Sequence, residues 1–233
     1  MNEAKPDVAT HATAADTMNP SRKQQPDHRT GLTPRLRLLQ RDGGLSSEQA
    51  EIFDRVTRTR KSLAQGSDGL PGPWNAMLYS TQIGSLMERM GDVCRNTATY
   101  KAHPGLIEIG ICMVGVEWVS QFEVYAHLAM ARESGVSEQM LNALLEKNPA
   151  SQVHTMTAAT EAERAVYAFG RELLDNKRVS DECYAAVHAH IGDQGIVELV
   201  HTMGHYVNVS MSLNCFNVPL PKGKELPFAE PKL

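Results

Sequence analysis

The sequence of 233 residues lacks paired cysteines. Its four cysteines are Cys94, Cys112, Cys183 and Cys215, and no two of them form a C-x-x-C pair. Zinc knuckles and dithiol redox sites need such closely spaced thiols, so the spacing argues against both kinds of site. Scattered cysteines are typical of a reducing compartment, and we therefore expect a cytoplasmic protein.

The sequence also lacks a basic excess and long apolar runs. It carries 23 Lys and Arg against 27 Asp and Glu, a formal net charge of -4. Binding to nucleic acid requires basic residues that neutralise phosphates, so we expect no nucleic-acid partner. No uncharged apolar run reaches the roughly eighteen residues of a membrane span, and the N-terminus has no apolar signal-peptide core. We therefore expect a protein that neither crosses a membrane nor is secreted.

The first thirty residues contain no Leu, Ile, Phe, Tyr or Trp, and their charges cancel. Such a segment cannot bury enough apolar surface to offset the entropy lost on ordering it. We therefore expect a disordered tail over residues 1–30 and one folded domain over residues 31–233, which carries the net charge.

Strand signals are nearly absent, because no Asn-Gly or Asp-Gly turn lies between alternating apolar runs. Several segments have helical periodicity. Capping-box patterns at Ser46 and Thr160 mark the starts of two of them, and Pro-Gly or Gly residues mark breaks between others. The sequence therefore predicts an all-α fold, with helices over residues 46–64, 73–90, 104–116, 120–134, 137–145, 160–174, 180–192 and 194–214.

One pair of polar residues stands out in this helical pattern. Glu123 and His127 are four residues apart, so on a helix they share one face. A carboxylate beside an imidazole orients the ring and raises its basicity, as in a proton-transfer pair. Glu108 falls inside the apolar segment 104–116, where an ionised carboxylate needs a partner. Their convergence would form an acid–base site.

Simpler roles compete with this interpretation. Ser120-x-x-Glu123 has the form of a capping box, so Glu123 could close the start of its helix. His127 could equally be a core histidine whose hydrogen bonds are satisfied. Spacing alone does not separate these alternatives.

Several segments together resemble a known family. They are residues 72–80, the helix of Glu108, residues 122–137, residues 195–200 and residues 213–221. In this order they resemble the carboxymuconolactone decarboxylase family, within the alkylhydroperoxidase D-like (AhpD-like) superfamily. The resemblance covers about two-thirds of the chain and implies an AhpD-like helical bundle that assembles as a homotrimer or higher oligomer.

The peroxidase branch of that superfamily uses a Glu, then a C-x-x-C pair, then a His. The matching positions here hold Glu108, Ser120, Glu123 and His127. Because serine supplies no thiolate and a carboxylate forms no disulfide, peroxidase chemistry through this site is excluded. The resemblance instead implies a lyase that decarboxylates a small lactone or oxygenated ring in aromatic catabolism. In it, Glu123 and His127 would exchange protons, assisted by Glu108, without a cofactor.

The expected substrate contacts come from several other segments. Relatives carry an arginine before the Glu108 position, and this chain has none there, which puts their specific substrate in doubt. Arg89, Arg95 or Arg132 could replace that arginine, although surface roles are the simpler explanation of all three. Other candidate substrate-binding residues are His205 and His201, four apart on the last predicted helix, together with Tyr79 and Trp74 in segment 72–80.

Each of these candidates also has a structural explanation. The two histidines could lie at a subunit interface or on the helix surface, and Tyr79 and Trp74 could pack in the core. A His-x-x-x-His pair can bind a metal ion, but the resemblance does not require one, and we expect no metal. The chain as a whole could be a ligand-binding or scaffold protein without catalysis, or a thiol peroxidase that uses Cys112 or Cys183.

Overall fold

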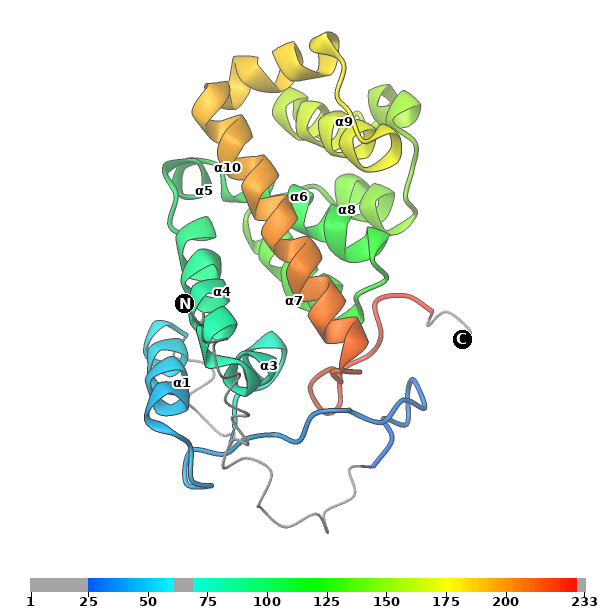
Figure 1. The fold of residues 1–233 in the computed structure, drawn as a ribbon. Helices are drawn as coiled ribbons and strands as arrows, with labels where there is room; N and C mark the ends of the chain where they lie inside the picture. The colour runs from blue at the N-terminus through cyan, green and yellow to red at the C-terminus, as the bar shows by residue number, and fades with distance from the viewer. Residues whose placement is uncertain (1–24, 61–68, 230–233) are drawn as a thin grey trace, which may run out of the picture.

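The computed structural model describes residues 25–60 and 69–229, which form helices joined by short loops (Figure 1). Within these residues there is no β-strand, and the only β-type pairing is one isolated antiparallel bridge between Gln40 and Gly69. The all-α prediction is therefore confirmed. The helices are α1 (Ser47–Thr59), α3 (Pro73–Tyr79), α4 (Thr81–Cys94), α5 (Ala98–Ala102), α6 (Pro104–Glu117), α7 (Gln121–Glu133), α8 (Glu138–Leu145), the 3-10 helix η2 (Ala150–Thr155), α9 (Glu161–Asn176) and α10 (Asp181–Cys215).

Local capping defines several helix starts as the sequence predicts. Ser46 and Gln49 form a reciprocal capping box at α1, and Thr160 and Glu163 form another at α9. Helix α1 ends at Thr59, before the predicted end, and residues 61–64 of that prediction lie outside the described residues.

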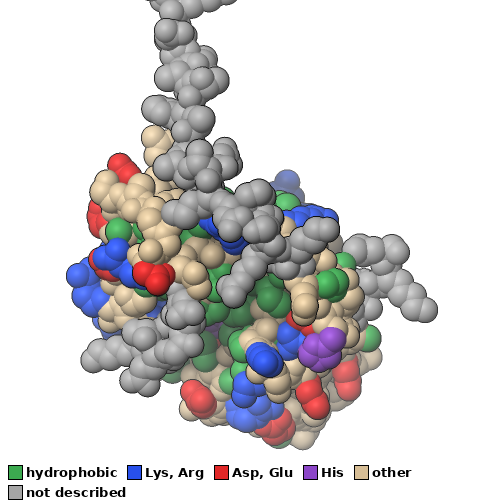
Figure 2. Space-filling model, turned by 90° about the horizontal axis from the view of Figure 1, so that it is seen from below, with side chains coloured by type: hydrophobic (Ala, Val, Ile, Leu, Met, Phe, Trp, Pro, Cys, Tyr) green, Lys and Arg blue, Asp and Glu red, His purple; other side chains and the backbone are tan. Residues whose placement is uncertain are grey.

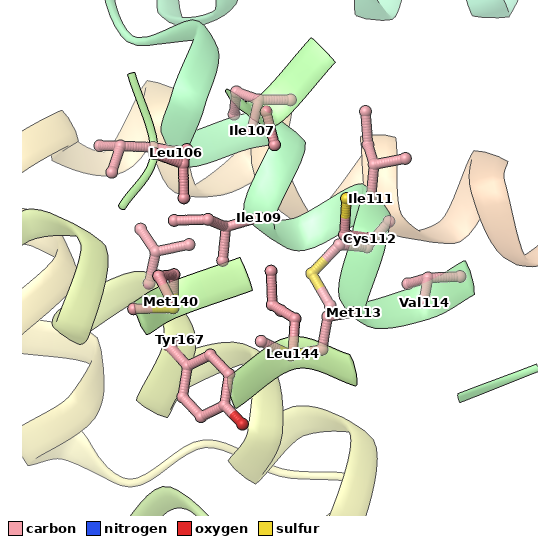
Figure 3. Packing of buried hydrophobic residues seen from close by; sticks show 14 of the residues in the cluster. Leu106, Ile107, Ile109, Ile111, Cys112, Met113, Val114, Met140, Leu144 and Tyr167 are labelled. Carbon is pink, nitrogen blue, oxygen red and sulfur yellow. The ribbon is translucent and has the colours of Figure 1, made fainter. Parts of the chain in front are cut away.

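Helix α6 is the centre of the fold. Every residue from Leu106 to Val116 is buried, and α6 packs against α5, α7, α8, α9 and α10. A helix that is apolar on all sides must be surrounded in this way. Figure 3 shows Ile109, Met113, Met140 and Tyr167 packed in this cluster. Burial of each large apolar side chain contributes about 1.5–3 kcal/mol, so the helix that carries Glu108 is firmly held.

The predicted helix over residues 73–90 is wrong in one respect, because the chain breaks at Ser80. Its φ of -137° and ψ of 89° separate α3 from α4. Gly84 allows α4 to approach α3 closely, since a Cβ there would lie 2.0 Å from the Met77 carbonyl oxygen. The break turns Ile83 and Leu86, which the helical pattern assigned to the apolar face, outward with exposures of 64% and 69%.

Helix α10 runs diagonally across the molecule and bends at Gly192, whose φ of 63° interrupts the helical backbone (Figure 1). The two halves correspond to the helices predicted over 180–192 and 194–214. The short helices α5 and η2 have no counterpart in the prediction, because five or six residues carry little periodic pattern.

The described chain begins beside the C-terminal segment and then runs along the lower edge of the fold to α1 (Figure 1). Arg29 donates to the carbonyl oxygens of Leu220, Pro221 and Lys224, and its guanidinium also pairs with Asp27. Contacts with the domain therefore begin a few residues before the boundary predicted at residue 30, while residues 1–24 lie outside the described part.

Figure 2 shows the face of the molecule that is seen from below. Hydrophobic side chains lie in the central part of this face, and charged side chains lie around them. Among the described residues, no helix combines the length and apolar character needed to cross a membrane.

Candidate active site

Three of the predicted residues meet between α6 and α7. His127 Nδ1 lies 2.6 Å from Glu108 Oε2, and both side chains are buried. Glu108 projects from the central helix α6, while His127 comes from α7, the next helix in the chain. Because Glu108 accepts the Nδ1 proton, it fixes the orientation of the ring and leaves Nε2 for other partners.

Glu123 lies on the other side of the same imidazole. Its Oε2 is 3.2 Å from His127 Nε2, as the spacing of four residues on one helix face predicts. This contact is an ion pair without hydrogen-bond alignment, because Glu123 Oε2 has no hydrogen-bond partner among the described residues. A buried carboxylate oxygen without a hydrogen bond remains free to accept a proton from a ligand.

The competing role of Glu123 as a helix cap is not observed. Ser120 is the N-cap residue of α7, but its side chain makes no capping hydrogen bond, and its buried Oγ has no partner within the part of the chain that the structure describes. The side chain of Glu123 is only 4% exposed. The capping-box pattern therefore does not form here, in contrast to α1 and α9.

Tyr100 completes the surroundings of Glu108. Its hydroxyl donates to Glu108 Oε1 at 2.7 Å, so both oxygens of this carboxylate are engaged. Burial and the charge of Glu108 raise the pKa of Tyr100, which keeps the hydroxyl protonated as a donor. Glu108 is thereby supported on both sides, which offsets the cost of burying it in α6.

The two carboxylates determine the charge of the imidazole. Burial alone would lower the pKa of His127, but the charges of Glu108 and Glu123, together with the hydrogen bond to Glu108, outweigh burial and raise the pKa to about 9. At neutral pH the ring is therefore an imidazolium, which can donate a proton. Tyr206 packs edge-on against it, with ring centroids 4.7 Å apart. Burial and the charge of Glu123 raise the pKa of Tyr206 well above its ordinary value.

Glu123 and His127 border a cavity of about 420 Å³. This volume falls in the range of small-molecule sites. The cavity lies between α7, α10, α4 and the segment around α3, and it is lined by Thr59, Arg60, Pro73, Trp74, Met77, Met87, Glu88, Gly91, Arg95, Phe122, Glu123, Ala126, His127, Met130, His205, Tyr206 and Val209.

Two of the four candidate substrate-binding residues line the cavity, and the other two do not. Trp74 and His205 line it, whereas His201 is exposed on α10 and lies outside its lining. Tyr79 is also outside the lining, and its hydroxyl donates to the Arg37 carbonyl oxygen at 2.7 Å. His201 and Tyr79 are therefore not positioned to contact a ligand bound in this cavity.

Of the three candidate arginines, one lies at the cavity and two lie on the surface. Arg95 lines the cavity, whereas Arg89 is exposed and Arg132 pairs with Glu138 on the surface. Arg60, at the end of α1, is a further cavity arginine that was not among the predicted residues. It lies far in the sequence from the motif residues, so no local sequence pattern indicates that it reaches the cavity.

The cysteines do not provide an alternative reaction centre of the dithiol type. All four are free. Cys112 is buried beside the site, and burial together with the charges of Glu108 and Glu123 raises its pKa well above the ordinary value. Burial also raises the pKa values of Cys94 and Cys183. Raised pKa values reduce the thiolate fraction that peroxidase chemistry needs.

Among the described residues, no three His, Cys, Asp or Glu side chains are placed together to hold a metal ion.

Comparisons with known proteins identify the fold. No family model matches the chain, and no curated protein matches it. Among solved structures, an uncharacterised peroxidase-related protein from Silicibacter sp. aligns with a TM-score of 0.62 at 11% identity, over 85% of this chain and 95% of that one. A protein of unknown function from Agrobacterium tumefaciens, described as a candidate antioxidant defence protein AhpD, aligns with a TM-score of 0.50 at 18% identity, over 63% of this chain and 96% of that one. The chain therefore has the AhpD-like helical fold.

Proposed function

We propose that this protein is an enzyme that catalyses proton transfer on a small molecule, with Glu123 as the base and His127 as the acid. The observation that supports this proposal is the Glu108–His127–Glu123 cluster at the wall of the cavity, with His127 Nδ1 2.6 Å from Glu108 and Nε2 3.2 Å from Glu123. The free oxygen of Glu123 can take a proton, and the imidazolium of His127 can deliver one. Glu108 serves as the buried counter-ion that orients the ring.

Within this class we favour a lyase that resembles the carboxymuconolactone decarboxylases and acts on a small lactone or oxygenated ring without a cofactor. Loss of carbon dioxide leaves an electron pair on carbon, and that carbon must then be protonated. The imidazolium of His127 is suited to deliver this proton, and its positive charge stabilises the developing anion. Isomerisation or ring opening would use the same two groups.

The test separates proton transfer from the identity of the substrate. Purified protein is incubated in deuterated water with lactones, β-keto acids and hydroxylated aromatic acids, and deuterium incorporation and product formation are followed by NMR. We expect Glu123→Gln and His127→Gln each to reduce exchange and turnover by about 100-fold or more. His201→Gln, an exposed position on α10, is the matched control. Rates in both site variants equal to that of the parent would contradict the proposal.

Two other functions give different results in the same assay. A ligand-binding or scaffold protein of this fold would bind compounds in the cavity without catalysing exchange. The peroxidase-related name of the Silicibacter protein raises thiol peroxidase activity as the other alternative. That activity would be lost in a variant with all four cysteines changed to Ala, whereas we expect this variant to retain proton transfer.

We further propose that the chain forms a homotrimer or higher oligomer in the cytoplasm. The outer face of α4 supports the assembly, because Ile83, Leu86 and Val93 are 64%, 69% and 57% exposed. Apolar side chains grouped on a helix surface are typical of a protein interface.

A further inference from the structure

The cavity holds a second group of polar side chains besides Glu123 and His127. Arg60 follows α1, Arg95 follows α4, and His205 lies on α10. Three separate elements thus bring two guanidinium groups and an imidazole to one small cavity. The charge of Arg95 acts on Tyr100 and Tyr206, next to Glu108 and His127.

Arg60 is held in the cavity wall but is incompletely satisfied. Its side chain is 13% exposed, and its Nη1 lies 3.7 Å from Glu88 Oε1. The guanidinium carbon lies 5.2 Å from the centre of the Trp74 ring. Glu88 is more tightly engaged by Arg55, whose Nε donates to Glu88 Oε2 at 2.6 Å. One carboxylate therefore serves two arginines, and the buried Nε of Arg60 has no hydrogen-bond partner among the described residues.

His205 adds a second unsatisfied nitrogen. Its Nδ1 is buried without a hydrogen-bond partner among the described residues. Burial and the nearby charge of Arg60 lower the pKa of His205 to about 4, so the ring is neutral at neutral pH and retains one N–H donor.

Gly91 lets both groups lie close to α4. A Cβ at this position would lie 3.0 Å from His205 Nε2, which is tighter than an ordinary contact, and 3.9 Å from Arg60 Nη2. The two side chains therefore meet at the same part of the cavity wall. A guanidinium and an imidazole that converge on one cavity, each with an unsatisfied nitrogen, are suited to bind an oxyanion.

We propose that Arg60, Arg95 and His205 form a subsite for the carboxylate group of a small organic acid. A guanidinium matches a carboxylate in shape and charge, and a neutral imidazole donates one further hydrogen bond. Trp74, Met77 and Phe122 supply apolar walls for a flat carbon skeleton. This inference rests on the proposed function in one respect: it makes such acids the substrate class of the Glu123–His127 site.

The first measurement compares two probes of nearly equal shape, benzoate and benzamide, by titration calorimetry on the parent protein. We expect saturable benzoate binding and at least about tenfold weaker benzamide binding, because only benzoate carries the negative charge. Equal affinity for the two probes, or no saturable benzoate binding, would overturn the proposal.

The second measurement uses paired variants. Arg60→Gln removes the charge, and Gly91→Ala places a Cβ against His205 Nε2 and displaces that ring; we expect each to weaken benzoate binding at least about tenfold. The controls are Arg41→Gln, which removes an arginine that is 53% exposed, and Gly204→Ala, where a Cβ meets nothing within 4 Å. Both controls should bind benzoate like the parent. Benzoate affinity unchanged in Arg60→Gln would refute the subsite, and if that variant does not fold, the two-probe comparison decides.

A third measurement separates this inference from the proposed function. Glu123→Gln removes the proposed base but leaves the subsite intact, so it should still bind benzoate in preference to benzamide. If Glu123→Gln retains full turnover while Arg60→Gln loses benzoate, the acid–base proposal fails and the subsite stands. If Glu123→Gln loses turnover and benzamide binds as well as benzoate, the subsite fails and the acid–base proposal stands.

Discussion

The buried histidines predict an unusual dependence of stability on pH. The pKa of His127 is raised from 6.5 to about 9 by its carboxylate partners, and that of His205 is lowered from 6.5 to about 4 by burial and Arg60. A group whose pKa differs between the folded and unfolded states makes the free energy of unfolding depend on pH.

The two effects have opposite signs. Folded His127 binds its proton more tightly than the unfolded chain does, so its contribution is complete below pH 6.5 and is lost as pH rises toward 9. Folded His205 resists protonation, so its contribution is complete above pH 6.5 and is lost as pH falls toward 4. Each difference in pKa corresponds to about 3 kcal/mol. These two groups therefore favour a maximum of stability near pH 6.5.

The assay is urea unfolding followed by circular dichroism across this pH range. Between pH 6.5 and about 8.5, below the range in which the raised thiols and tyrosines titrate, we expect the parent to lose about 2 kcal/mol of unfolding free energy. His127→Gln should remove this alkaline decline, and His205→Gln should reduce the acidic one. His201→Gln, exposed on the same helix as His205, should retain both.

A constant free energy of unfolding in the parent between pH 6.5 and about 8.5 would refute the charge assignment of His127. Because His127→Gln leaves two buried carboxylates with less compensation, that variant could unfold at every pH. In that case the ring resonances of His127 in the parent decide directly, since an NMR titration midpoint near the ordinary value would also refute the assignment.

Three further predictions address packing, the site and assembly. Gly84→Ala should cost at least about 1–3 kcal/mol of unfolding free energy, because its Cβ would lie 2.0 Å from a backbone carbonyl of α3, whereas Gly204→Ala should not destabilise. Tyr100→Phe removes the 2.7 Å hydrogen bond to Glu108 and should cost about 1.5–3 kcal/mol in thermal or urea unfolding; stability equal to that of the parent would argue against an ionised Glu108. Leu86→Lys, on the exposed face of α4, should reduce the assembly in sedimentation to smaller species without altering the circular dichroism of the fold; an unchanged assembly would place the interface elsewhere.

The central residues of the candidate site could be predicted from the sequence because two of them are close neighbours on one helix. Glu123 and His127 are separated by one helical turn, so the pattern alone predicts their proximity, and the structure gives 3.2 Å between the nearest atoms. Glu108 was predictable for another reason: a carboxylate inside an otherwise apolar segment requires a partner. The unobserved cap at Ser120 shows the limit of such patterns, since a capping box and an i to i+4 ion pair can share the same glutamate.

The remaining contacts depend on packing between distant segments. Tyr100 lies on a helix too short for a periodic signal, and Arg60 reaches the cavity from the end of α1. The break at Ser80 depends on the close approach of Gly84 to α3, which local propensity does not report. Because α3 and α4 are separate helices, residues of both line the cavity, among them Trp74 and Gly91.

The second carboxylate beside His127 has a consequence for the chemistry of the histidine. A histidine flanked by one carboxylate can remain uncharged at neutral pH. His127 has Glu108 at Nδ1 and Glu123 beside Nε2, and its pKa therefore rises to about 9. Such a ring is a poor base at neutral pH and a good source of a proton. In the proposed mechanism, Glu123 therefore abstracts the proton, and its Oε2 has no hydrogen-bond partner among the described residues. The proposed roles of acid and base depend on the second carboxylate as well as on the histidine, so removal of Glu123 should abolish the base and also lower the pKa of the acid.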